Sequence, residues 1–250
     1  MRKIAIQICL VISMTFVSIQ AQENVQKAIN FNDRGVEQVN AEKYEAAIES
    51  FNQAINLHPN YPTAYYNLGT TFYFLKQFEK AVGMFQQAVV LNPSYPEAYN
   101  QLGVTYLELN QHRKAIDALE KAIRQKPDST TAHYNLGCAY IRLENFKAAI
   151  AFLERARDFD SRNAEIRVNL SYAYERQKRY NEAIAEMREA VILNRNDKDA
   201  QFHLGILYLL KKNKQSALAQ YNVVKSLDPE LGHRLYLSIY QDKIVSVAKF

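Results

Sequence analysis

Apolar and polar residues follow a 34-residue pattern along most of the chain. Each period holds two stretches in which apolar side chains recur at i, i+3, i+4 and i+7. In residues 96–129 the first stretch carries Tyr99, Leu102 and Tyr106, and Leu119 lies in the second. This spacing is typical of two amphipathic helices separated by a short polar turn. The pattern therefore predicts an all-α chain built from stacked helical pairs.

A small residue recurs at one place in every period. Glycine fills five of the six places and serine fills the sixth: Gly35, Gly69, Gly103, Gly137, Ser171 and Gly205. A glycine inside a helix costs about 1 kcal/mol relative to alanine, so its recurrence indicates a close contact between paired helices. A fixed period of this length is typical of a solenoid. The predicted units are 28–61, 62–95, 96–129, 130–163, 164–197 and 198–231, which together with residues 22–27 form one array.

The second unit has the clearest set of recurring residues. Counted from Pro62 as position 1, they are Tyr65, Leu68, Gly69, Phe72, Phe78, Ala81, Phe85, Ala88 and Pro93. This set resembles the tetratricopeptide repeat, W-x2-L-G-x2-Y, then A-x3-F, then P, over 34 residues. The resemblance implies a right-handed α-solenoid of six helix-turn-helix units. We expect the small residues at positions 8, 20 and 27 to let the helices approach, and the large residues at positions 4, 11 and 24 to fill the space around them.

The fifth unit departs most from the pattern. It has Arg167 at position 4, Ser171 at position 8 and Met187 at position 24. The sequence therefore predicts that the array is least regular here.

The N-terminus resembles a targeting segment. Arg2 and Lys3 precede an apolar stretch, Ile8–Ile19, and the small residue Ala21 is followed by polar residues. This order is typical of a secretory signal peptide, and the apolar stretch is short for a membrane span, which needs roughly 20 residues. We expect residues 1–21 to be removed and the protein to be exported, periplasmic or secreted. The alternative is an uncleaved segment that anchors the protein to the membrane.

The C-terminal residues 232–250 lack the features of a seventh unit. Leu235 and Ile239 fall on one stripe of a possible helix, which predicts a capping helix over the sixth unit. The alternative is that this segment binds a partner.

Charge and cysteine content narrow the function. The net charge is +5, and removal of Arg2 and Lys3 leaves 29 basic residues against 26 acidic ones. Charges of both signs are mixed along the helices, which argues against a nucleic-acid partner. Cys138 is the single cysteine after the targeting segment, so no internal disulfide is expected.

No motif for catalysis appears in the sequence. The five histidines show no metal-ligand spacing, and His133 occupies a position-4 packing place. No phosphate-binding glycine loop or nucleophile motif is present. We therefore expect no enzyme activity, no cofactor, no metal and no small-molecule substrate.

The resemblance implies a binding groove instead. In this family the first helix of each unit lines a concave surface through positions 2, 5, 6, 9, 12 and 13. The predicted partner-binding residues are Tyr66, Asn67, Tyr73, Phe74, Asn100, Gln101, Tyr134, Asn135, Arg142, Asn169, Arg176 and Phe202. Position 6 carries mostly amides, similar to the asparagine ladder in the superhelix of O-linked N-acetylglucosamine transferases. An amide can donate to and accept from a peptide backbone at once.

Each of these features also has a purely structural interpretation. Asparagine is common at position 6 in this family, and the aromatic residues are equally suited to packing between helices. The pair Arg142 and Arg176, both at position 13, is expected to hold an acidic group. No three consecutive units supply the residues of a two-carboxylate clamp for chaperone C-termini, so that use is rejected.

The sequence thus predicts a non-catalytic scaffold that binds a peptide segment or partner protein in its groove. The alternative is a structural component that self-assembles, or joins a membrane complex, through its terminal cap or edge. RNA binding by helical repeats is disfavoured by the 34-residue period and the small net charge.

Overall fold

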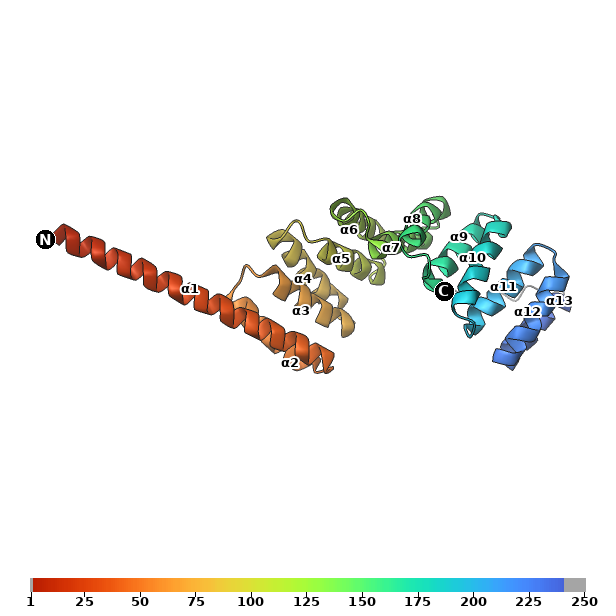
Figure 1. Cartoon of the computed structure of the whole chain (residues 1–250), viewed down its shortest axis with the longest axis horizontal. Helices are drawn as coiled ribbons and strands as arrows, with labels where there is room; N and C mark the ends of the chain where they lie inside the picture. The colour runs from red at the N-terminus through yellow and green to blue at the C-terminus, as the bar shows by residue number, and fades with distance from the viewer. Residues whose placement is uncertain (1, 241–250) are drawn as a thin grey trace. The chain divides into compact units, whose positions relative to one another are not determined.

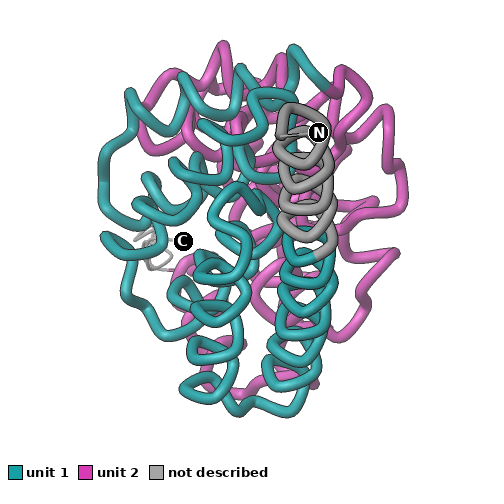
Figure 2. The backbone as a smooth tube through the Cα atoms, turned by 90° about the vertical axis from the view of Figure 1, so that its left-hand side faces the viewer, with its two compact units in different colours: residues 1–125 teal, residues 126–250 magenta. Residues whose placement is uncertain are grey.

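The computed structural model describes the backbone of residues 2–240 and the side chains of residues 20–240. This part of the chain forms 13 helices and no strand (Figure 1). The predicted all-α helical-repeat fold is therefore confirmed. The chain divides into two compact units, residues 1–125 and residues 126–250 (Figure 2).

Paired helices make up both units. Unit 1 contains α1 (Arg2–Asn40), α2 (Tyr44–Leu57), α3 (Pro62–Phe74), α4 (Phe78–Leu91), α5 (Pro96–Glu108) and α6 (His112–Gln125). Unit 2 contains α7 (Thr130–Arg142), α8 (Phe146–Phe159), α9 (Ala164–Arg176), α10 (Tyr180–Leu193), α11 (Lys198–Leu210), α12 (Lys214–Leu227) and α13 (Pro229–Tyr240). The apolar spacing predicted helices at positions 1–14 and 18–31 of each unit. From α3 to α12 the helices occupy positions 1–13 and 17–30, so each begins and ends within one residue of the predicted place.

Local sequence explains where these helices begin. Pro62 and Pro96 stand at the first positions of α3 and α5, where a missing N–H costs nothing. In unit 2, Ser129, Asn163 and Asp197 accept hydrogen bonds from backbone N–H groups at the starts of α7, α9 and α11. The first helix of each of these units therefore begins either with a proline or with a polar residue whose side chain caps the helix.

The turn inside each helical pair has a feature that the sequence pattern did not indicate. One residue at position 15 of every unit has a positive φ near 57°: Glu42, Lys76, Asn110, Glu144, Lys178 and Lys212. None of them is glycine, although this conformation costs other residues about 1 kcal/mol or more. The repeat therefore imposes the same left-handed residue on six different local sequences.

The recurring glycines lie where the paired helices touch. A Cβ atom on Gly103 would lie 2.5 Å from Cγ of Leu119, and one on Gly137 would lie 2.6 Å from Cγ of Leu153. Leu119 and Leu153 both stand at position 24 of the same unit as the glycine. Gly205 is different, because its neighbour is Leu235 of α13. The C-terminal helix thus supplies the side chain that the second helix supplies in earlier repeats.

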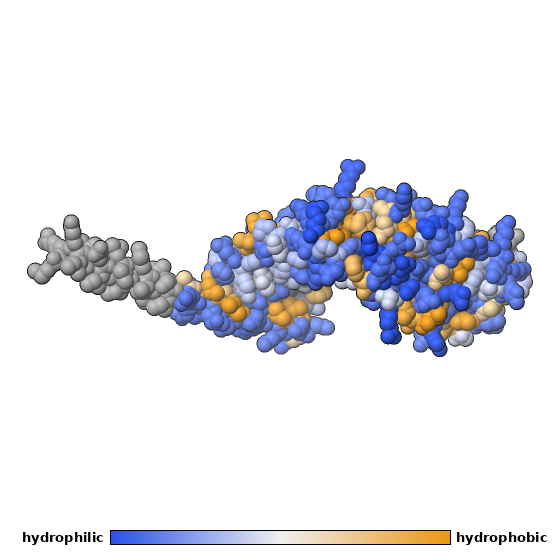
Figure 3. Space-filling view, turned by 45° about the horizontal axis from the view of Figure 1, so that its top comes forward, coloured by the Kyte–Doolittle hydropathy of each residue, from blue (hydrophilic) through white to orange (hydrophobic). Residues whose placement is uncertain are grey.

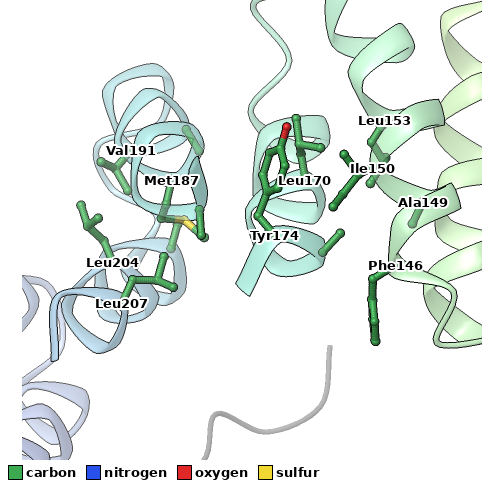
Figure 4. Packing of buried hydrophobic residues seen from close by; sticks show 14 residues of the cluster. Phe146, Ala149, Ile150, Leu153, Leu170, Tyr174, Met187, Val191, Leu204 and Leu207 are labelled. Carbon is green, nitrogen blue, oxygen red and sulfur yellow. The ribbon is translucent and has the colours of Figure 1, made fainter. Parts of the chain in front are cut away.

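The core of unit 2 is continuous across several helices. Figure 4 shows side chains of α8, α9, α10 and α11 pointing toward one another, with Leu153, Leu170 and Met187 fully buried among them. These residues recur at positions 24 and 7 of successive units. Each helical pair therefore packs its apolar stripe against the next pair within this unit.

The irregular fifth unit has specific replacements for the residues it lacks. Ser171 is fully buried, and its hydroxyl donates to the carbonyl oxygen of Ala183 over 2.8 Å. Arg167 forms an ion pair with Glu186, with 2.7 Å between Nη1 and Oε2. The residues that break the repeat pattern are thus satisfied locally. The lower regularity expected for this unit remains a prediction.

The predicted ends of the chain are only partly described. The targeting segment, residues 1–21, lies almost entirely outside the described side chains. No helix in the described part of the chain is long and apolar enough to cross a membrane. Of the predicted capping segment, residues 232–240 belong to α13, which packs on α11 and α12 through Leu235 and Ile239. Residues 241–250 lie outside the described part.

Candidate functional site

Position-6 asparagines tie neighbouring repeats together in unit 1. The amide Nδ2 of Asn67 on α3 donates to Oδ1 of Asn32 on α1 over 2.8 Å. Asn32 is buried and in turn donates to Oδ1 of Asp33 over 3.3 Å. The first predicted ladder residue therefore uses its donor inside the protein.

Unit 2 repeats this arrangement with a tyrosine as the acceptor. Nδ2 of Asn169 on α9 lies 3.1 Å from the hydroxyl oxygen of Tyr134 on α7, and it also donates to the carbonyl oxygen of Glu165. The Tyr134 hydroxyl donates to the Glu165 carboxylate over 2.6 Å. Burial, together with the neighbouring Cys138 and Glu165, raises the pKa of Tyr134, so the hydroxyl stays protonated and keeps donating.

These two ties have one geometry. Each joins a position-6 amide to the position-5 residue of the preceding repeat, 35 residues earlier. Nδ2 of Asn67 uses one of its two N–H groups and Nδ2 of Asn169 uses both, whereas their Oδ1 atoms accept no hydrogen bond from the described residues. The expectation that each amide both donates to and accepts from a peptide stays a prediction at Asn67, whereas both N–H groups of Asn169 are used within the protein. At these two positions the carbonyl oxygen is left to accept a hydrogen bond from a peptide N–H.

The aromatic candidates in unit 1 fall into two groups. The ring of Tyr66 lies 5.8 Å from Phe85 and 5.2 Å from Tyr95, so it packs between helices, and burial raises its pKa. Tyr73 lies against Phe78 and Phe74, and Phe74 is 54% exposed. The exposed end of α3 therefore presents an aromatic surface, whereas Tyr66 mainly stabilises the packing.

Phe202 has no exposed surface to offer. It is 1% exposed on α11, in the core that α13 helps to close, with the guanidinium of Arg234 5.4 Å from its ring centroid. A partner cannot reach its ring without displacing α13, so we no longer place Phe202 on the binding surface.

The two position-13 arginines are exposed at the ends of α7 and α9. Arg176 donates to the hydroxyl of Tyr172 over 2.7 Å, and its guanidinium lies 4.6 Å from the ring centroid of Phe146. This stacking holds one face of the Arg176 guanidinium and leaves the other N–H groups for an acidic group. Arg142 makes contacts of its own within the protein.

The remaining candidates are half-buried on the first helices. Asn100 and Gln101 lie on α5 in unit 1, and Asn135 lies on α7 in unit 2. Asn100 and Asn135 have partners within the protein. The candidates thus belong to two groups, one on α3 and α5 and one on α7 and α9.

Sequence reasoning missed two carboxylates that complete this surface. Glu165 orients both Tyr134 and Asn169, and it stands at position 2, one turn before Asn169. Glu175 accepts a hydrogen bond from Nε2 of the buried His203 over 2.5 Å. Position 2 was among the groove positions that the family resemblance implied, so Glu165 could have been found from its number alone.

The described residues offer no group of three or more His, Cys, Asp or Glu side chains that could hold a metal ion. Cys138 contacts Tyr134, and burial raises the pKa of its thiol to about 11. His133 is buried, with Nδ1 2.9 Å from the carbonyl oxygen of Ser129, as its packing place predicted.

Family models match most of the array. One described as "Tetratricopeptide repeat" matches residues 100–164, 134–198 and 168–231, and one described as "TPR repeat" matches residues 39–76 and 71–110. The chain belongs to the tetratricopeptide repeat family. Proteins of this family are generally protein-interaction scaffolds. No curated protein sequence matches the chain.

Solved structures share the fold at low sequence identity. YrrB, described as a TPR protein with an unusual peptide-binding site, is 24% identical over 76% of this chain and 98% of its own, with a TM-score of 0.66. PilF of Pseudomonas aeruginosa is 14% identical over 88% of this chain and 100% of its own, with a TM-score of 0.74. A chain of the APC/C hetero-tetramer Cut9-Hcn1 is 18% identical over 89% of this chain and 45% of its own, with a TM-score of 0.68. At these identities the likeness concerns the fold.

Proposed function

We propose that this protein is a non-catalytic scaffold that binds an extended segment of a partner protein along the exposed faces of its first helices. The observation that carries the proposal is the pair of asparagine carbonyl oxygens, on Asn67 and Asn169, whose amide nitrogens are already held. A carbonyl oxygen fixed in this way is preorganised to accept from a peptide N–H. The description of YrrB as a peptide-binding TPR protein is consistent with this use.

Aromatic and basic side chains beside these amides supply the contacts that select a sequence. Phe74 offers an exposed ring in unit 1, and Arg176 offers an exposed guanidinium in unit 2. Backbone acceptors hold a peptide irrespective of its side chains, whereas rings and guanidinium groups select apolar and acidic residues. We therefore expect apolar residues in a segment bound to unit 1 and acidic residues in a segment bound to unit 2.

The test is affinity capture from the native host, with the bound proteins quantified by mass spectrometry. The double variant Asn67→Ala with Asn169→Ala removes both carbonyl oxygens. The matched control is Asn32→Ala, which breaks the same tie between repeats as Asn67→Ala but keeps the Asn67 amide. Loss of the partner from the double variant together with its retention by Asn32→Ala supports the proposal. Equal recovery by all three proteins contradicts it.

Export is part of the proposal, because residues 1–21 have the order of a secretory signal. Mass spectrometry of the protein purified from its host tests this directly. A chain that begins close to Gln22 supports cleavage, and an intact Met1 in a membrane fraction supports the anchored alternative.

A second candidate function is self-assembly, or attachment to a membrane complex, through α13. Tyr236 and Tyr240 are exposed on this helix, with ring centroids 4.6 Å apart, and Tyr221 lies beside Tyr236. Exposed aromatic rows of this kind are common at interfaces. Light scattering of the wild type and of Tyr236→Ser with Tyr240→Ser distinguishes the two candidates. A monomer in both cases rules out self-assembly through this surface.

A further inference from the structure

The second helices of unit 1 form a groove that the proposed peptide surface does not include. It has a volume of about 540 Å³ and is lined by residues of α4, α5 and α6. Tyr99 and Tyr106 of α5 line it, whereas the peptide-surface candidates Asn100 and Gln101 lie on the other stripe of the same helix, since successive residues turn by about 100°. The groove is therefore a separate surface.

The groove has both apolar and polar walls, with Val90 among its apolar residues. Val90 of α4 is 69% exposed, which is unusual for a valine on a helix that packs against its neighbours. Tyr106 forms part of the wall, and its hydroxyl accepts a hydrogen bond from Gln86 Nε2 over 2.9 Å. Figure 3 shows apolar surface in separate patches on a mostly hydrophilic face.

Two lysines stand at the groove with their charges uncompensated. The ammonium of Lys114 lies 5.6 Å from the ring centroid of Tyr106, and that of Lys121 lies 5.6 Å from the ring centroid of Tyr99. Neither forms an ion pair with a carboxylate of the described residues. Asp117 also lines the groove and forms no ion pair there, so the lining carries a net positive charge.

The equivalent place in unit 2 is occupied by side chains. Residues 68 positions later form the same framework, and Tyr174 donates to the Glu154 carboxylate where Tyr106 pairs with Gln86. Of the lining residues, only Leu102 and Tyr106 keep their type, as Leu170 and Tyr174. Glu182 and Glu189 replace Lys114 and Lys121, and Val89, Tyr99 and Ala118 are replaced by Arg157, Arg167 and Glu186. The Glu186 carboxylate binds both arginines, at 2.6 and 2.7 Å, and its side chain is only 12% exposed. The place in unit 2 is therefore closed by its own ion pairs, whereas the groove in unit 1 is open and its lining carboxylate, Asp117, forms no ion pair.

We propose that the groove of α4, α5 and α6 is a second docking surface, which takes an acidic segment of a partner protein. Lys114 and Lys121 are two turns apart on α6, so their Cα atoms are separated by about 10 Å along the helix axis. The segment carries two carboxylates at about this spacing, with a bulky apolar side chain between them that enters the groove beside Val90.

The experiment selects displayed random peptides of about 12 residues on the full chain. Counter-selection uses the variant Val89→Arg, Tyr99→Arg, Ala118→Glu, which transfers the three closing residues of unit 2 into unit 1. Peptides rich in Asp and Glu around a bulky apolar residue, bound by the wild type alone, support the proposal. Neutral or basic peptides, or the same peptides from both proteins, overturn it.

Surface variants test the charges without altering the core. Lys114→Glu with Lys121→Glu is expected to weaken a selected peptide by about tenfold or more, whereas Lys→Arg at both positions retains it. The matched pair Val90→Glu and Val90→Lys removes the same apolar side chain with opposite charge. Weaker binding to Val90→Glu than to Val90→Lys is expected, and equal binding contradicts an acidic ligand.

Two further measurements exclude other occupants. The variant Asn67→Ala with Asn169→Ala keeps the selected peptide if the groove is an independent site, and loses it if the first-helix surface is the true site. Sedimentation of the wild type and the closed variant tests whether a second copy of this chain fills the groove. An oligomer that dissociates on closing assigns the groove to self-association and overturns the proposal.

Discussion

The groove of unit 1 and its counterpart in unit 2 share one backbone framework and have opposite surfaces. In unit 1, Val89, Tyr99 and Ala118 leave an open apolar groove beside unpaired lysines. In unit 2, an Arg–Glu–Arg network fills the equivalent positions. The repeat fixes where a surface lies, and positions 4, 23 and 28 decide whether it is available to a partner.

The largest expected effect comes from removing the ion pairs that fill the surface of unit 2. Glu186→Ala leaves Arg167 partly buried without a carboxylate partner and leaves Arg157 with Asp158 alone, which is expected to destabilise unit 2 by about 3 kcal/mol. Amide hydrogen exchange in α9 and α10 measures this loss. The control is the triple variant Arg157→Val, Arg167→Tyr, Glu186→Ala, which gives unit 2 the residues of unit 1. This triple variant is expected to recover most of the stability. If Glu186→Ala is as stable as the wild type, the ion pairs do not contribute to the stability of unit 2.

A second effect concerns the helix contact beside each groove. Gly103→Ser gives α5 the residue that α9 has at Ser171, and the added Cβ would lie 2.5 Å from Cγ of Leu119. We expect a loss of about 2 kcal/mol in thermal or urea unfolding. Unit 2 places the flexible Met187 opposite its serine, so Gly103→Ser with Leu119→Met is expected to recover part of the loss. No recovery would mean that the two residues are not coupled.

A smaller effect concerns the turns inside the helical pairs. Lys178 and Asn110 both have a positive φ, at 58° and 56°. Glycine adopts this conformation without a Cβ penalty, so Lys178→Gly is expected to stabilise the protein by about 1 kcal/mol. Asn110→Gly is expected to gain less, because asparagine tolerates this region better than lysine. Equal gains in melting temperature would contradict the role assigned to the side chain.

The smallest effect at neutral pH is expected from the tyrosine that pairs with Glu154. Burial, followed by the hydrogen bond to the Glu154 carboxylate, raises the pKa of Tyr174 above its ordinary value of 10. A raised pKa in the folded state adds stability below pH 10, and this stability is lost as the pH rises further. Thermal unfolding between pH 9 and pH 11 is therefore expected to fall less steeply for Tyr174→Phe than for the wild type. Parallel curves would contradict this assignment.

Much of the fold was predictable because the same pattern of apolar residues and glycines recurs in every unit. The apolar spacing located the helices to within one residue, and the glycine period indicated the helix contacts that Gly103 and Gly137 make. Local rules did not reveal the positive φ at position 15, since Lys76 and Glu144 are not typical of that conformation. Nor did they indicate that Leu235, rather than Tyr221 at position 24, would pack on Gly205.

The candidate site was less predictable. The sequence predicted the position-6 amides as a set, and the structure shows that Asn67 and Asn169 each use an N–H group between repeats. The repeat position of Phe202 placed it on the groove, but in the structure its ring lies in the core because α13 covers it. The family resemblance supplied the groove positions, and side-chain partners from neighbouring helices decided which atoms are left for a ligand.

The sequence by itself determined the helices, their pairing and the repeat of 34 residues, because these follow from periodic burial along one chain. Only the tertiary structure decided which surfaces are open. The difference between Tyr99 and Arg167 has meaning only beside Ala118 and Glu186, which come from another helix. Exposure and charge pairing are properties of side chains that meet across helices, and the local pattern of a single helix does not contain them.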